Sequence, residues 1–441
     1  MSEFVGRALA RGEEGYEEAR RAAVWNGRTA ERYPDLVVQA EDERDLIAAV
    51  SLARERGWKI GVRSGGHSWA GNHVRDGGLL LDVSRLDAVE VDREAKTAVV
   101  GPGVRGNELL EALLPQGLFF PAGHCPGVAL GGYLLQGGFG WNGRVHGPAC
   151  MSVEAIDVVT ADGGLVRADE QQNADLLWAA RGAGPGFFGV VARFHLRLYE
   201  APGHIANGVY LYPIEVLEEV FSWAREVGPR VAREMEMMVF IHRDAAGEPE
   251  IAVTGPVLAP SAERAAEALA LLEACPARSR AKAAAPNVPV RMADLYAAAH
   301  ASYPDGSRYA VDNMWTHASA AELLPGLRRI AETIPEAPSH MLWMNWGPSP
   351  ERPDMAYSVE DDTYIAVYGV WEDPEDDAAN VAWAAERMGE MAHLSSGIQL
   401  ADENLAARPA RFAAERNMAR LDELRTRHDP EGIFHPWMGR V

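Results

Sequence analysis

Two reactive side chains, His67 and Cys125, lie in glycine-rich segments of the sequence. His67 falls in RSGGHSWAG (63–71) and Cys125 in AGHCPGVALGGYLLQGGFG (122–140), and a third glycine-rich segment is RGAGPGFFG (181–189). Because glycine has no Cβ, the backbone N–H groups of such loops can approach an anion closely. Three of these loops in one part of the chain predict a large ligand wrapped by backbone, with a pyrophosphate among its parts.

The residue types indicate more than backbone binding. A lone histidine after Gly65-Gly66 would be expected only to hydrogen-bond within its turn. A second nucleophile, Cys125, in another glycine loop makes the pair a more specific pattern, because an imidazole and a thiol can both bond to a ligand. His124 either orients Cys125 or packs in the core, and the sequence does not separate these two interpretations.

A Rossmann-type site and a P-loop are both disfavoured. The stretch GPGFFG (184–189) matches G-x-G-x-x-G, but it follows the helix-like LLWAARGA and precedes the strand-like VVARFHLRLY. A dinucleotide fingerprint needs the reverse order, with a strand before the glycines and a helix after them. A P-loop needs Gly-Lys followed by Ser or Thr, and the sequence contains neither.

Composition excludes several kinds of partner. The net charge is −22 and only three lysines occur, so we expect neither nucleic acid nor an anionic membrane as a partner. Cys125, Cys150 and Cys275 are too few and too widely spaced for a disulfide framework or a thiolate metal site, and we expect Cys150 and Cys275 to be buried thiols. The charged N-terminus and the lack of an apolar run of about 20 residues predict a cytoplasmic protein without a bound metal.

The elements that position these residues change in character along the chain. The first 200 residues predict short strands, glycine turns, helices over 41–57 and 104–117, and a hairpin over 154–168. From about residue 203, strands alternate with longer helices, which predicts an α+β fold with a sheet backed by helices. This alternation is lost in the last 40 residues. The predicted elements of the second part are helices over 261–275, 322–334 and 376–391 and strands over 339–347 and 363–371.

In order and spacing, the three glycine segments resemble those of the berberine-bridge-enzyme-like FAD oxidases, a branch of the vanillyl-alcohol-oxidase superfamily. The resemblance is dense over residues 20–200 and returns at RLDELRTRHDPEGIF near the C-terminus. It implies a split FAD-binding domain of the vanillyl-alcohol-oxidase type, formed by residues 1–202 and 397–441. Residues 203–396 would then form a substrate domain, an antiparallel sheet backed by helices.

The resemblance also implies how the cofactor is held. His67 matches the histidine joined to the flavin 8α-methyl group, and Cys125 matches the cysteine joined to flavin C6, so FAD would be attached at two points. Val128 falls where the family controls oxygen access, and valine there favours an oxidase. The other positions implied to contact FAD are Arg63, Ser64, Gly65, Gly66, Ser68, Gly71, Gly131, Gly132, Gly137, Gly138, His146, Ile156, Phe188, Gly189, Val191, Gln399 and Asn404.

The chain departs from the family pattern where a catalytic base is expected. The family's Tyr-x-Asn-Tyr corresponds to Gly-Ile-Gln-Leu (397–400), and leucine cannot accept a proton. A frequent His-Arg pair is replaced by Val359-Glu360. The base must therefore come from another residue on strands expected to cover the flavin. The candidates are Tyr357, Tyr364, Tyr368, Glu360, Trp343, Asn345 and Trp346, among which Tyr357, Tyr368, Glu360 and Asn345 are preferred.

From this resemblance we expect an oxidase that transfers a hydride from a small molecule to flavin N5 and passes the electrons to O₂, giving H₂O₂. The substrate would bear a hydroxyl or an amine and be a secondary metabolite or a sugar. Two alternatives stay open at this point: a dehydrogenase with a different electron acceptor, and a flavin-binding protein without redox turnover. Neither the oligomeric state nor the identity of the substrate follows from the sequence.

Overall fold

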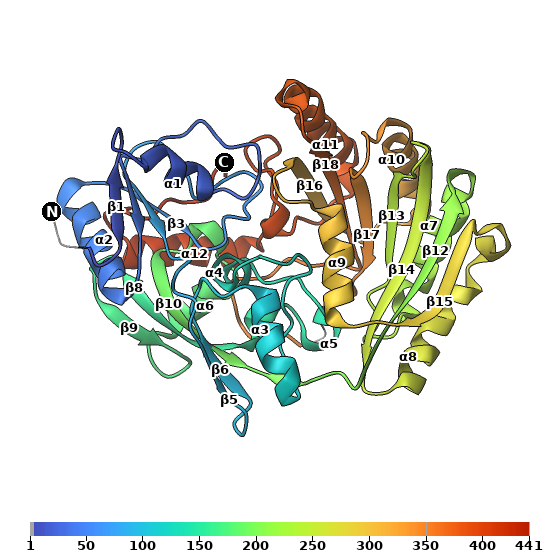
Figure 1. Cartoon of the computed structure of the whole chain (residues 1–441), viewed down its shortest axis with the longest axis horizontal. Coiled ribbons are helices and arrows are strands. Elements are labelled where there is room, and N and C mark those ends of the chain that lie inside the picture. Colours follow the sequence, from blue (N-terminus) through green and yellow to red (C-terminus); the bar gives the residue numbers. More distant parts are fainter. Residues whose placement is uncertain (1–3, 350, 441) are drawn as a thin grey trace.

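The computed structural model describes residues 4–349 and 351–440, and it has two halves that lie side by side (Figure 1). One half contains the N-terminal sheets, and the red C-terminal helix α12 (Glu415–His428) lies with them. The other half is one large sheet with its covering helices, formed by the intervening part of the chain. The predicted α+β class is confirmed.

The first small sheet has the strand order β1-β2-β4-β3. Strands β2 and β3 both run parallel to β4, and β1 is antiparallel to β2. Helix α2 (Glu43–Arg56) connects β2 to β3; it begins where Asp42 accepts a hydrogen bond from the Arg44 N–H and ends at Gly57, with φ of 64°. The remaining elements here are β1 (Arg7–Ala10), α1 (Tyr16–Ala22), β2 (Leu36–Gln39), β3 (Ile60–Arg63) and β4 (Leu79–Asp82).

A second, fully antiparallel sheet has the order β5-β6-β10-β8-β9. The hairpin predicted over 154–168 is its β8–β9 pair, and Gly163, at φ of 88°, forms the turn. Its strands are β5 (Val89–Asp92), β6 (Thr97–Val100), β8 (Val153–Thr160), β9 (Leu165–Ala168) and β10 (Gly189–Arg197). The same half contains β7 (Leu118–Phe119), β11 (Tyr199–Glu200), α3 (Gly106–Leu113), α4 (Leu130–Leu135), α5 (Gly143–His146) and α6 (Ala174–Ala180).

The second half is a seven-stranded antiparallel sheet of order β15-β12-β14-β13-β17-β18-β16. Its strands are β12 (His204–Pro213), β13 (Met238–Arg243), β14 (Pro249–Ala259), β15 (Ala283–Pro289), β16 (Arg308–Thr316), β17 (His340–Asn345) and β18 (Thr363–Trp371). Its helices are α7 (Leu217–Val227), α8 (Ala262–Leu269), α9 (Met292–Ser302), α10 (Ala320–Thr333) and α11 (Asp377–Met391). The predicted sheet backed by helices is confirmed.

Side chains of the large sheet alternate between two clusters, as expected for a strand with a period of two. On β17, Met341 and Trp343 belong to the core shared with the helices α7, α10 and α11. Leu342 and Met344, one residue on in each case, belong to a separate cluster on the opposite face. That second face is turned toward the N-terminal half, so one side of the sheet is free to line a site.

The C-terminal segment completes the N-terminal half. Ile60 on β3 donates its N–H to the Ile433 carbonyl and accepts from the His435 N–H, extending the edge of the first sheet. Arg425 on α12 bonds the Gly186 carbonyl in the third glycine segment. The proposed boundaries at residues 202 and 396 stay a prediction. None of the helices in the described ranges has the length and apolarity to cross a bilayer.

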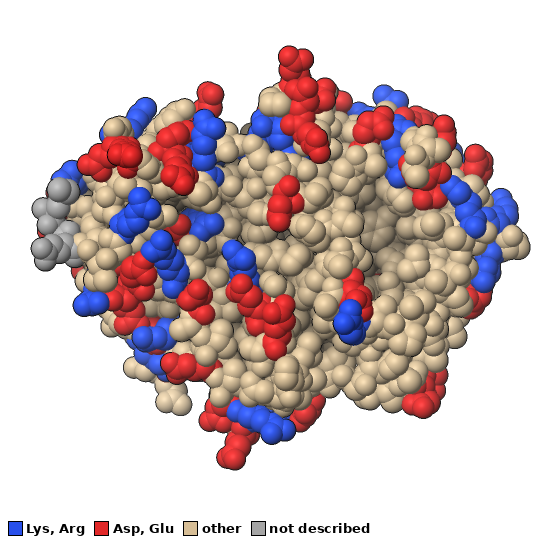
Figure 2. Space-filling view, in the orientation of Figure 1, with Lys and Arg blue, Asp and Glu red and all other residues tan. Residues whose placement is uncertain are grey.

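Surface charge is mixed rather than segregated. Figure 2 shows Lys and Arg side chains interspersed with Asp and Glu on the displayed face, with no extended basic area. Many of these charges pair at the surface, for example Arg328 with Glu218 and Arg440 with Asp422. An alternating pattern of this kind offers no continuous track for a polyanion on this face.

Candidate active site

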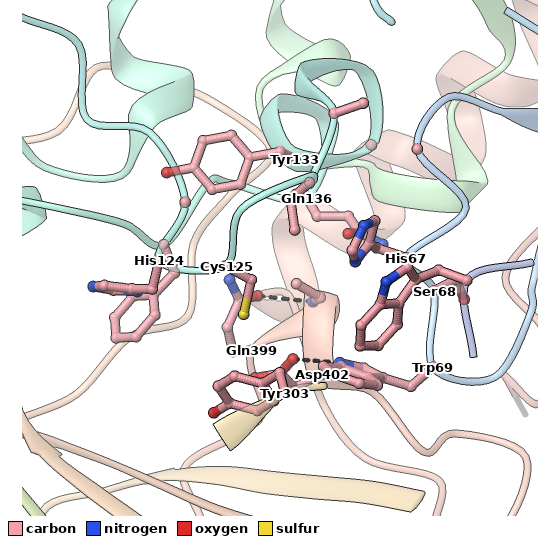
Figure 3. A pocket seen from close by; sticks show the side chains of 18 of the residues that line it. His67, Ser68, Trp69, His124, Cys125, Tyr133, Gln136, Tyr303, Gln399 and Asp402 are labelled. Carbon is pink, nitrogen blue, oxygen red and sulfur yellow. Dashed lines mark hydrogen bonds between the residues drawn. The ribbon is translucent and has the colours of Figure 1, made fainter. Parts of the chain in front are cut away.

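A cavity of about 650 Å³ lies between the two halves. In Figure 3, His67 and Cys125 enter it from two different loops, while Gln399 and Asp402 enter it from the C-terminal segment. We call the lining residues within 63–69 and 123–136 the glycine wall. We call the lining side chains of β13, β17 and β18 the sheet wall; these are Met238, Phe240, His242, Arg243, His340, Leu342, Met344, Tyr364 and Tyr368.

The glycine wall is formed by two loops that pack directly on each other. A Cβ at Gly131 would lie 2.2 Å from Ser64 Oγ, and one at Gly65 would lie 2.9 Å from the Ala129 nitrogen. Gly66 has φ of +75°, and a Cβ there would lie 2.3 Å from the Ala23 carbonyl oxygen. Any side chain at these positions would push the loops apart or strain the backbone, so the wall depends on glycine.

His67 is held by aromatic stacking. Its ring lies 4.7 Å from that of Trp25 with 19° between the planes, and Trp25 stacks in turn on Tyr309 at 4.9 Å. Burial, and then the charge of Arg63, lower the pKa of His67 to about 4. The imidazole is therefore neutral near pH 7 and has a free lone pair for nucleophilic chemistry.

Cys125 lines the same cavity, and its sulfur points into it (Figure 3). Burial, and then the charge of Asp402, raise the pKa of the thiol to about 12, so it is protonated near pH 7. The neighbouring His124 lies 2.8 Å through Nε2 from Glu236 Oε2, and Glu236 also accepts from the Asn142 N–H at 2.6 Å. His124 thus ties the Cys125 loop to the sheet half.

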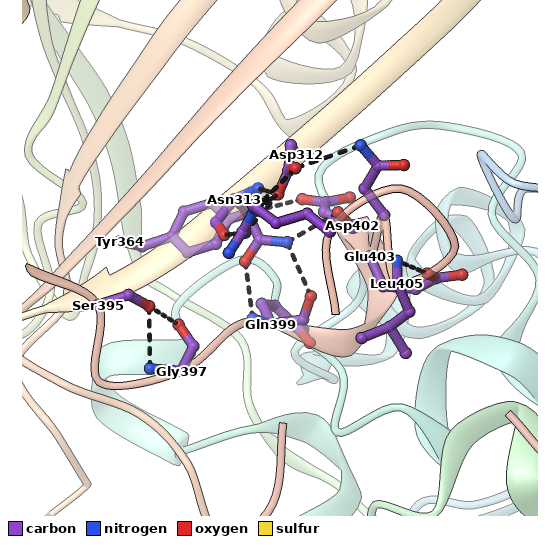
Figure 4. A network of polar contacts seen from close by, with 11 residues as sticks. Asp312, Asn313, Tyr364, Ser395, Gly397, Gln399, Asp402, Glu403 and Leu405 are labelled. Atoms are coloured by element: carbon purple, nitrogen blue, oxygen red, sulfur yellow. Dashed lines mark hydrogen bonds and ion pairs between the residues drawn. The ribbon is translucent and has the colours of Figure 1, made fainter. Parts of the chain in front are cut away.

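The C-terminal segment brings polar groups to the cavity between the two walls. Asn313 on β16 accepts from the Gln399 N–H at 2.7 Å and donates to the carbonyls of Gln399 and Asp402 at 3.0 and 2.7 Å (Figure 4). Arg408 forms an ion pair with Asp312, the residue before Asn313. These contacts fix the backbone of residues 399–402, and with it the side chains of Gln399 and Asp402.

Asp402 meets three donors. Tyr364 and Tyr368 both donate to its Oδ2, the second at 2.9 Å, and Trp69 Nε1 donates to its Oδ1 at 2.7 Å. Burial, and then the Asp402 charge, raise the pKa of both tyrosines well above the ordinary value, so both phenols are neutral donors. Of the described residues that line the cavity, Asp402 is the only one with a carboxylate.

Tyr303 and His340 form a second polar pair beside this cluster. Tyr303 lies 3.0 Å through its hydroxyl from His340 Nε2, and His340 Nδ1 lies 2.9 Å from the Pro338 carbonyl. The Nδ1–H therefore donates a hydrogen bond to the carbonyl, and Nε2 accepts one from the Tyr303 hydroxyl. The His340 ring also stacks on Tyr368 at 4.7 Å, which joins the two pairs into one aromatic surface.

Comparison with known proteins places the chain in a family. Residues 34–169 match the FAD binding domain family. The FAD-linked oxidoreductase nodO of Hypoxylon pulicicidum is 31% identical over 425 residues, which cover 94% of this chain and 93% of that protein. The chain belongs to the FAD-linked oxidoreductases. As a member of this family it is an oxidoreductase enzyme, and its N-terminal half is an FAD-binding half.

Solved structures agree in fold with this FAD-linked oxidoreductase. The 6-hydroxy-D-nicotine oxidase of Arthrobacter nicotinovorans superposes with a TM-score of 0.86 at 22% identity, covering 98% of this chain and 97% of that one. Physcomitrella patens BBE-like 1 superposes with a TM-score of 0.84 at 19% identity, covering 99% and 98%. The resemblance to berberine-bridge-enzyme-like proteins and the vanillyl-alcohol-oxidase type of fold are confirmed.

The cavity of the FAD-linked oxidoreductase fits this cofactor. A Cβ at Gly132 would meet no protein atom within 4 Å, so the backbone there presents a flat, open surface to the cavity. The Nε2 atoms of Gln399 and His435, both lining residues, are buried and have no hydrogen-bond partner among the described residues. Buried polar atoms of this kind need a partner, and a bound ligand with polar edges supplies one.

Most of the implied FAD-contacting residues do line the cavity: Arg63, Ser64, Gly65, Gly66, His67, Ser68, Cys125, Val128, Gly131, Gly132, Gly189, Val191 and Gln399. Seven others are not among the lining residues, and their contact with FAD stays a prediction. Ile156 and Phe188 are fully buried in the core, where Phe187 takes the lining position. The other five are Gly71, Gly137, Gly138, His146, which stacks on Tyr199, and Asn404, which bonds Asp312.

Three of the four preferred base candidates, Glu360, Tyr357 and Asn345, do not line the cavity. Glu360 accepts from Trp346 Nε1 and the Ser349 N–H, away from the cavity. Tyr357 lies behind the glycine wall, against Gly137. Of the four preferred candidates, only Tyr368 lines the cavity.

Asn345, the third of them, points to the helix face of the sheet. Its Nδ2 donates to the Ala224 carbonyl on α7 at 2.8 Å, and its Oδ1 accepts from Trp343 Nε1. Trp343 and Asn345 share this parity on β17, which is opposite to that of the lining residues Leu342 and Met344. Of the other base candidates, Trp346 does not line the cavity, whereas Tyr364 does.

Sequence reasoning missed Asp402, His340 and Tyr303. Asp402 lies two positions beyond the segment in which the family tyrosines were sought, so a wider search there would have found it. His340 shares the parity of Leu342 and Met344 on β17, and the period of two is the signal that identifies it. Tyr303 follows the end of α9, and nothing in the sequence marks it as a cavity residue.

Proposed function

We propose that this FAD-linked oxidoreductase is an oxidase acting on a small molecule that bears a hydroxyl or an amine. The observation that carries the proposal is one cavity with two nucleophiles, His67 and Cys125, on its glycine wall and an aromatic cluster around Asp402 facing it. When bound, FAD would supply a hydride acceptor whose electrons go on to O₂, giving H₂O₂. The residues of the chain bind the cofactor, orient the substrate and hold its proton.

The cofactor would be held covalently through His67 and Cys125. The neutral imidazole, held by Trp25, supports this for His67; the thiol of Cys125 must first lose its proton, since its pKa is raised. Acid precipitation of the purified protein tests the attachment. We expect flavin absorbance in the pellet for wild type and for each single variant, His67→Ala or Cys125→Ala, and none for the double variant.

A matched control is Cys275→Ala, a buried cysteine of the sheet half that does not line the cavity, which should retain both attachments. A colourless wild-type pellet with all flavin in the supernatant would contradict covalent attachment. That result would not decide whether non-covalently bound FAD supports oxidation, which the turnover assay tests separately.

The lining of the substrate side favours an apolar substrate body over a sugar. Met238, Phe240, Leu342 and Met344 on the sheet wall are apolar, and Ala298 and Ala299 on α9 add small apolar surfaces. The polar side chains of the same wall already hydrogen-bond to other residues of the protein; they are His242, Arg243, His340, Tyr364 and Tyr368. A sugar-binding site would need many hydrogen-bonding groups along this surface, because each buried hydroxyl without a partner costs binding free energy. We expect cinnamyl alcohol or benzylamine to bleach the bound flavin anaerobically, and cellobiose to do so more slowly.

Oxygen as the acceptor is supported by Val128, which lines the cavity at the glycine wall. After anaerobic bleaching, wild-type flavin should recover its absorbance rapidly on admission of air, and Val128→Ile should slow this recovery. Slow recovery in wild type would favour a dehydrogenase with another acceptor. Absence of bleaching by every probe would instead favour a flavin-binding protein without turnover. The cytoplasmic location belongs to the same proposal and is tested by cell fractionation.

A further inference from the structure

The Asp402 carboxylate is arranged to receive a proton through a phenol. Tyr368 donates to Asp402 Oδ2 at 2.9 Å and lines the cavity, so its second lone pair can accept a hydrogen bond while its own proton points to the carboxylate. Tyr364 donates to the same oxygen, and Trp69 Nε1 holds the other oxygen at 2.7 Å. Asn313 fixes the backbone carbonyl of Asp402. The carboxylate is therefore held in one orientation.

The two tyrosines differ in what surrounds them. Rings that line the cavity surround Tyr368, namely Trp69 at 6.0 Å, Tyr303 at 5.2 Å and His340 at 4.7 Å. Tyr364 also lines the cavity, but it lies between one lining ring, Phe139, and the fully buried Trp315, each at 5.1 Å. Tyr368 is thus the tyrosine at the centre of the lining aromatic surface, and Tyr364 supports Asp402 from its edge.

We propose, on the basis of the proposed function, that Tyr368 and Asp402 form a two-step proton relay for the substrate. As the substrate C–H bond breaks and its hydride goes to FAD, the substrate O–H or N–H bond also breaks. That proton bonds to the Tyr368 hydroxyl oxygen, while the original phenol proton passes to Asp402 Oδ2. The substrate thus loses one hydride, which carries two electrons, and one proton. Asp402 ends as a neutral carboxylic acid. Tyr364 is a positioning residue that holds Asp402.

The second phenol pair, Tyr303 and His340, is a poorer relay. Protonation would turn a buried neutral imidazole into a buried cation, which a site of low dielectric constant disfavours. Burial already lowers the pKa of His340 to about 4. Protonation of Asp402 has the opposite effect, because it removes a charge from the cavity. The same geometry of phenol and acceptor therefore favours Asp402.

The groups that face Asp402 determine how its proton uptake will appear in a pH profile. From the described elements these are Tyr364 and Tyr368 of β18, Tyr303 after α9 and the thiol of Cys125. His340 lies one ring further away, stacked on Tyr368. All four facing groups are neutral near pH 7, so loss of activity on the acidic side reports uptake of a proton by the carboxylate before the substrate binds.

The decisive experiment is the rate of anaerobic flavin bleaching as a function of pH in the FAD-loaded protein, with cinnamyl alcohol and benzylamine as probes. We expect Asp402→Asn and Tyr368→Phe to lower the rate about 100-fold or more, as is usual for loss of a general base. With cinnamyl alcohol, which does not titrate in this range, Asp402→Asn should also abolish the decline of the rate toward acidic pH. Tyr364→Phe should lower the rate less than Tyr368→Phe.

The matched control is Tyr210→Phe, which removes another tyrosine–carboxylate hydrogen bond, that to Glu273, away from the cavity. It should keep the wild-type rate and pH profile. Flavin content is measured for every variant, so that loss of cofactor is separated from loss of the relay. Wild-type rates and an unchanged acidic decline in Asp402→Asn would overturn the relay. A loss in Tyr303→Phe and His340→Gln that exceeds the loss in Tyr368→Phe would transfer it to the other pair.

Binding of cinnamate provides a readout without turnover. Cinnamate brings a second carboxylate into the cavity, and the charge of Asp402 repels it. Asp402→Asn should therefore bind cinnamate with a lower Kd than wild type, followed through the flavin spectrum. Equal Kd values in both proteins would contradict the role of Asp402. Failure of both probes to bleach wild-type flavin would instead reject the proposed function, and the relay with it.

Discussion

The two walls of the cavity are built from different parts of the polypeptide. On the glycine wall the backbone itself forms the surface, because Gly65, Gly66 and Gly131 leave no room for a Cβ. On the sheet wall the backbone is remote, and alternate side chains such as Leu342 and Met344 form the surface. A backbone wall tolerates almost no change of residue, whereas a side-chain wall can be re-lined without refolding. This division fits a constant cofactor on one side and a variable substrate on the other.

The comparison is tested most strongly on β17, where neighbouring residues face opposite ways. Trp343 is fully buried against the helices, while Leu342 lines the cavity. We expect Trp343→Ala to lower the free energy of unfolding by about 3–5 kcal/mol, and Leu342→Ala by about 2 kcal/mol, since the cavity beside Leu342 already exists. Urea unfolding measures both. Equal losses would contradict the assignment of the two faces.

The next largest effect is expected between the walls, at Asn313. This fully buried side chain makes three hydrogen bonds to the backbone of Gln399 and Asp402. Asn313→Ala leaves those groups without partners, and we expect a loss of about 2–3 kcal/mol in the free energy of unfolding. Flavin bleaching should slow as well, because Asp402 is no longer fixed. Asn380→Ala, which removes a side-chain hydrogen bond from Asn380 Nδ2 to the Asp376 carbonyl at the start of α11, is the control for stability alone.

On the glycine wall itself, a substitution of Gly132 can fill part of the cavity without disturbing the fold. A side chain there would meet no protein atom, so Gly132→Leu should fold normally and occupy cavity space. Overpacking against a bound cofactor costs about 1–3 kcal/mol, so in the His67→Ala/Cys125→Ala background, which lacks covalent attachment, flavin affinity should fall about ten- to 100-fold. Gly389→Leu, at an exposed position on α11 with equally open surroundings, should leave flavin content unchanged. Normal flavin content in Gly132→Leu would show that the cofactor does not lie there.

A further comparison is one in which the two sides of the cavity should behave alike. His73, a lining residue beside the glycine wall, and His340, on the sheet wall, both have pKa values lowered to about 4 by burial. The unfolded chain binds these protons near pH 6.5, so the free energy of unfolding should fall as pH drops from about 6.5 to 4. Each histidine contributes at most about 1.4 kcal/mol per pH unit.

Replacing either residue with glutamine should flatten this part of the stability curve. His317→Gln is the control, since His317 is exposed and Asp361 raises its pKa rather than lowering it. A curve of unchanged slope in both buried variants would contradict the neutral state assigned to these rings.

The same division between the walls explains what the sequence could predict. Glycines at fixed spacing mark a backbone surface directly, so most of the predicted contacts within 63–68 and 125–132 do line the cavity. A surface made of side chains on a strand is marked in the sequence only by alternation with a period of two. That alternation does not show which face of the sheet meets the cofactor half. Asn345 was therefore predicted on the wrong face of β17, although its neighbour Met344 lines the cavity.

Contacts between distant segments account for the remaining failures. Asp402 reaches the cavity because Asn313, on a strand far earlier in the chain, holds its backbone. Glu360 is turned away because Trp346 and Ser349 bind its carboxylate. Neither arrangement has a local signature, since each depends on a partner brought near only by the folded sheet.

The hydrogen bonds between Ile60 and residues 433–435 have a consequence for biosynthesis. The edge of the first sheet, beside the loop that carries His67, is finished by a segment that is synthesised long after β3. Gln399 and Asp402 also arrive late. A nascent chain stopped before these residues would expose an incomplete cavity, so stable cofactor loading is expected only after residues 433–435 have emerged.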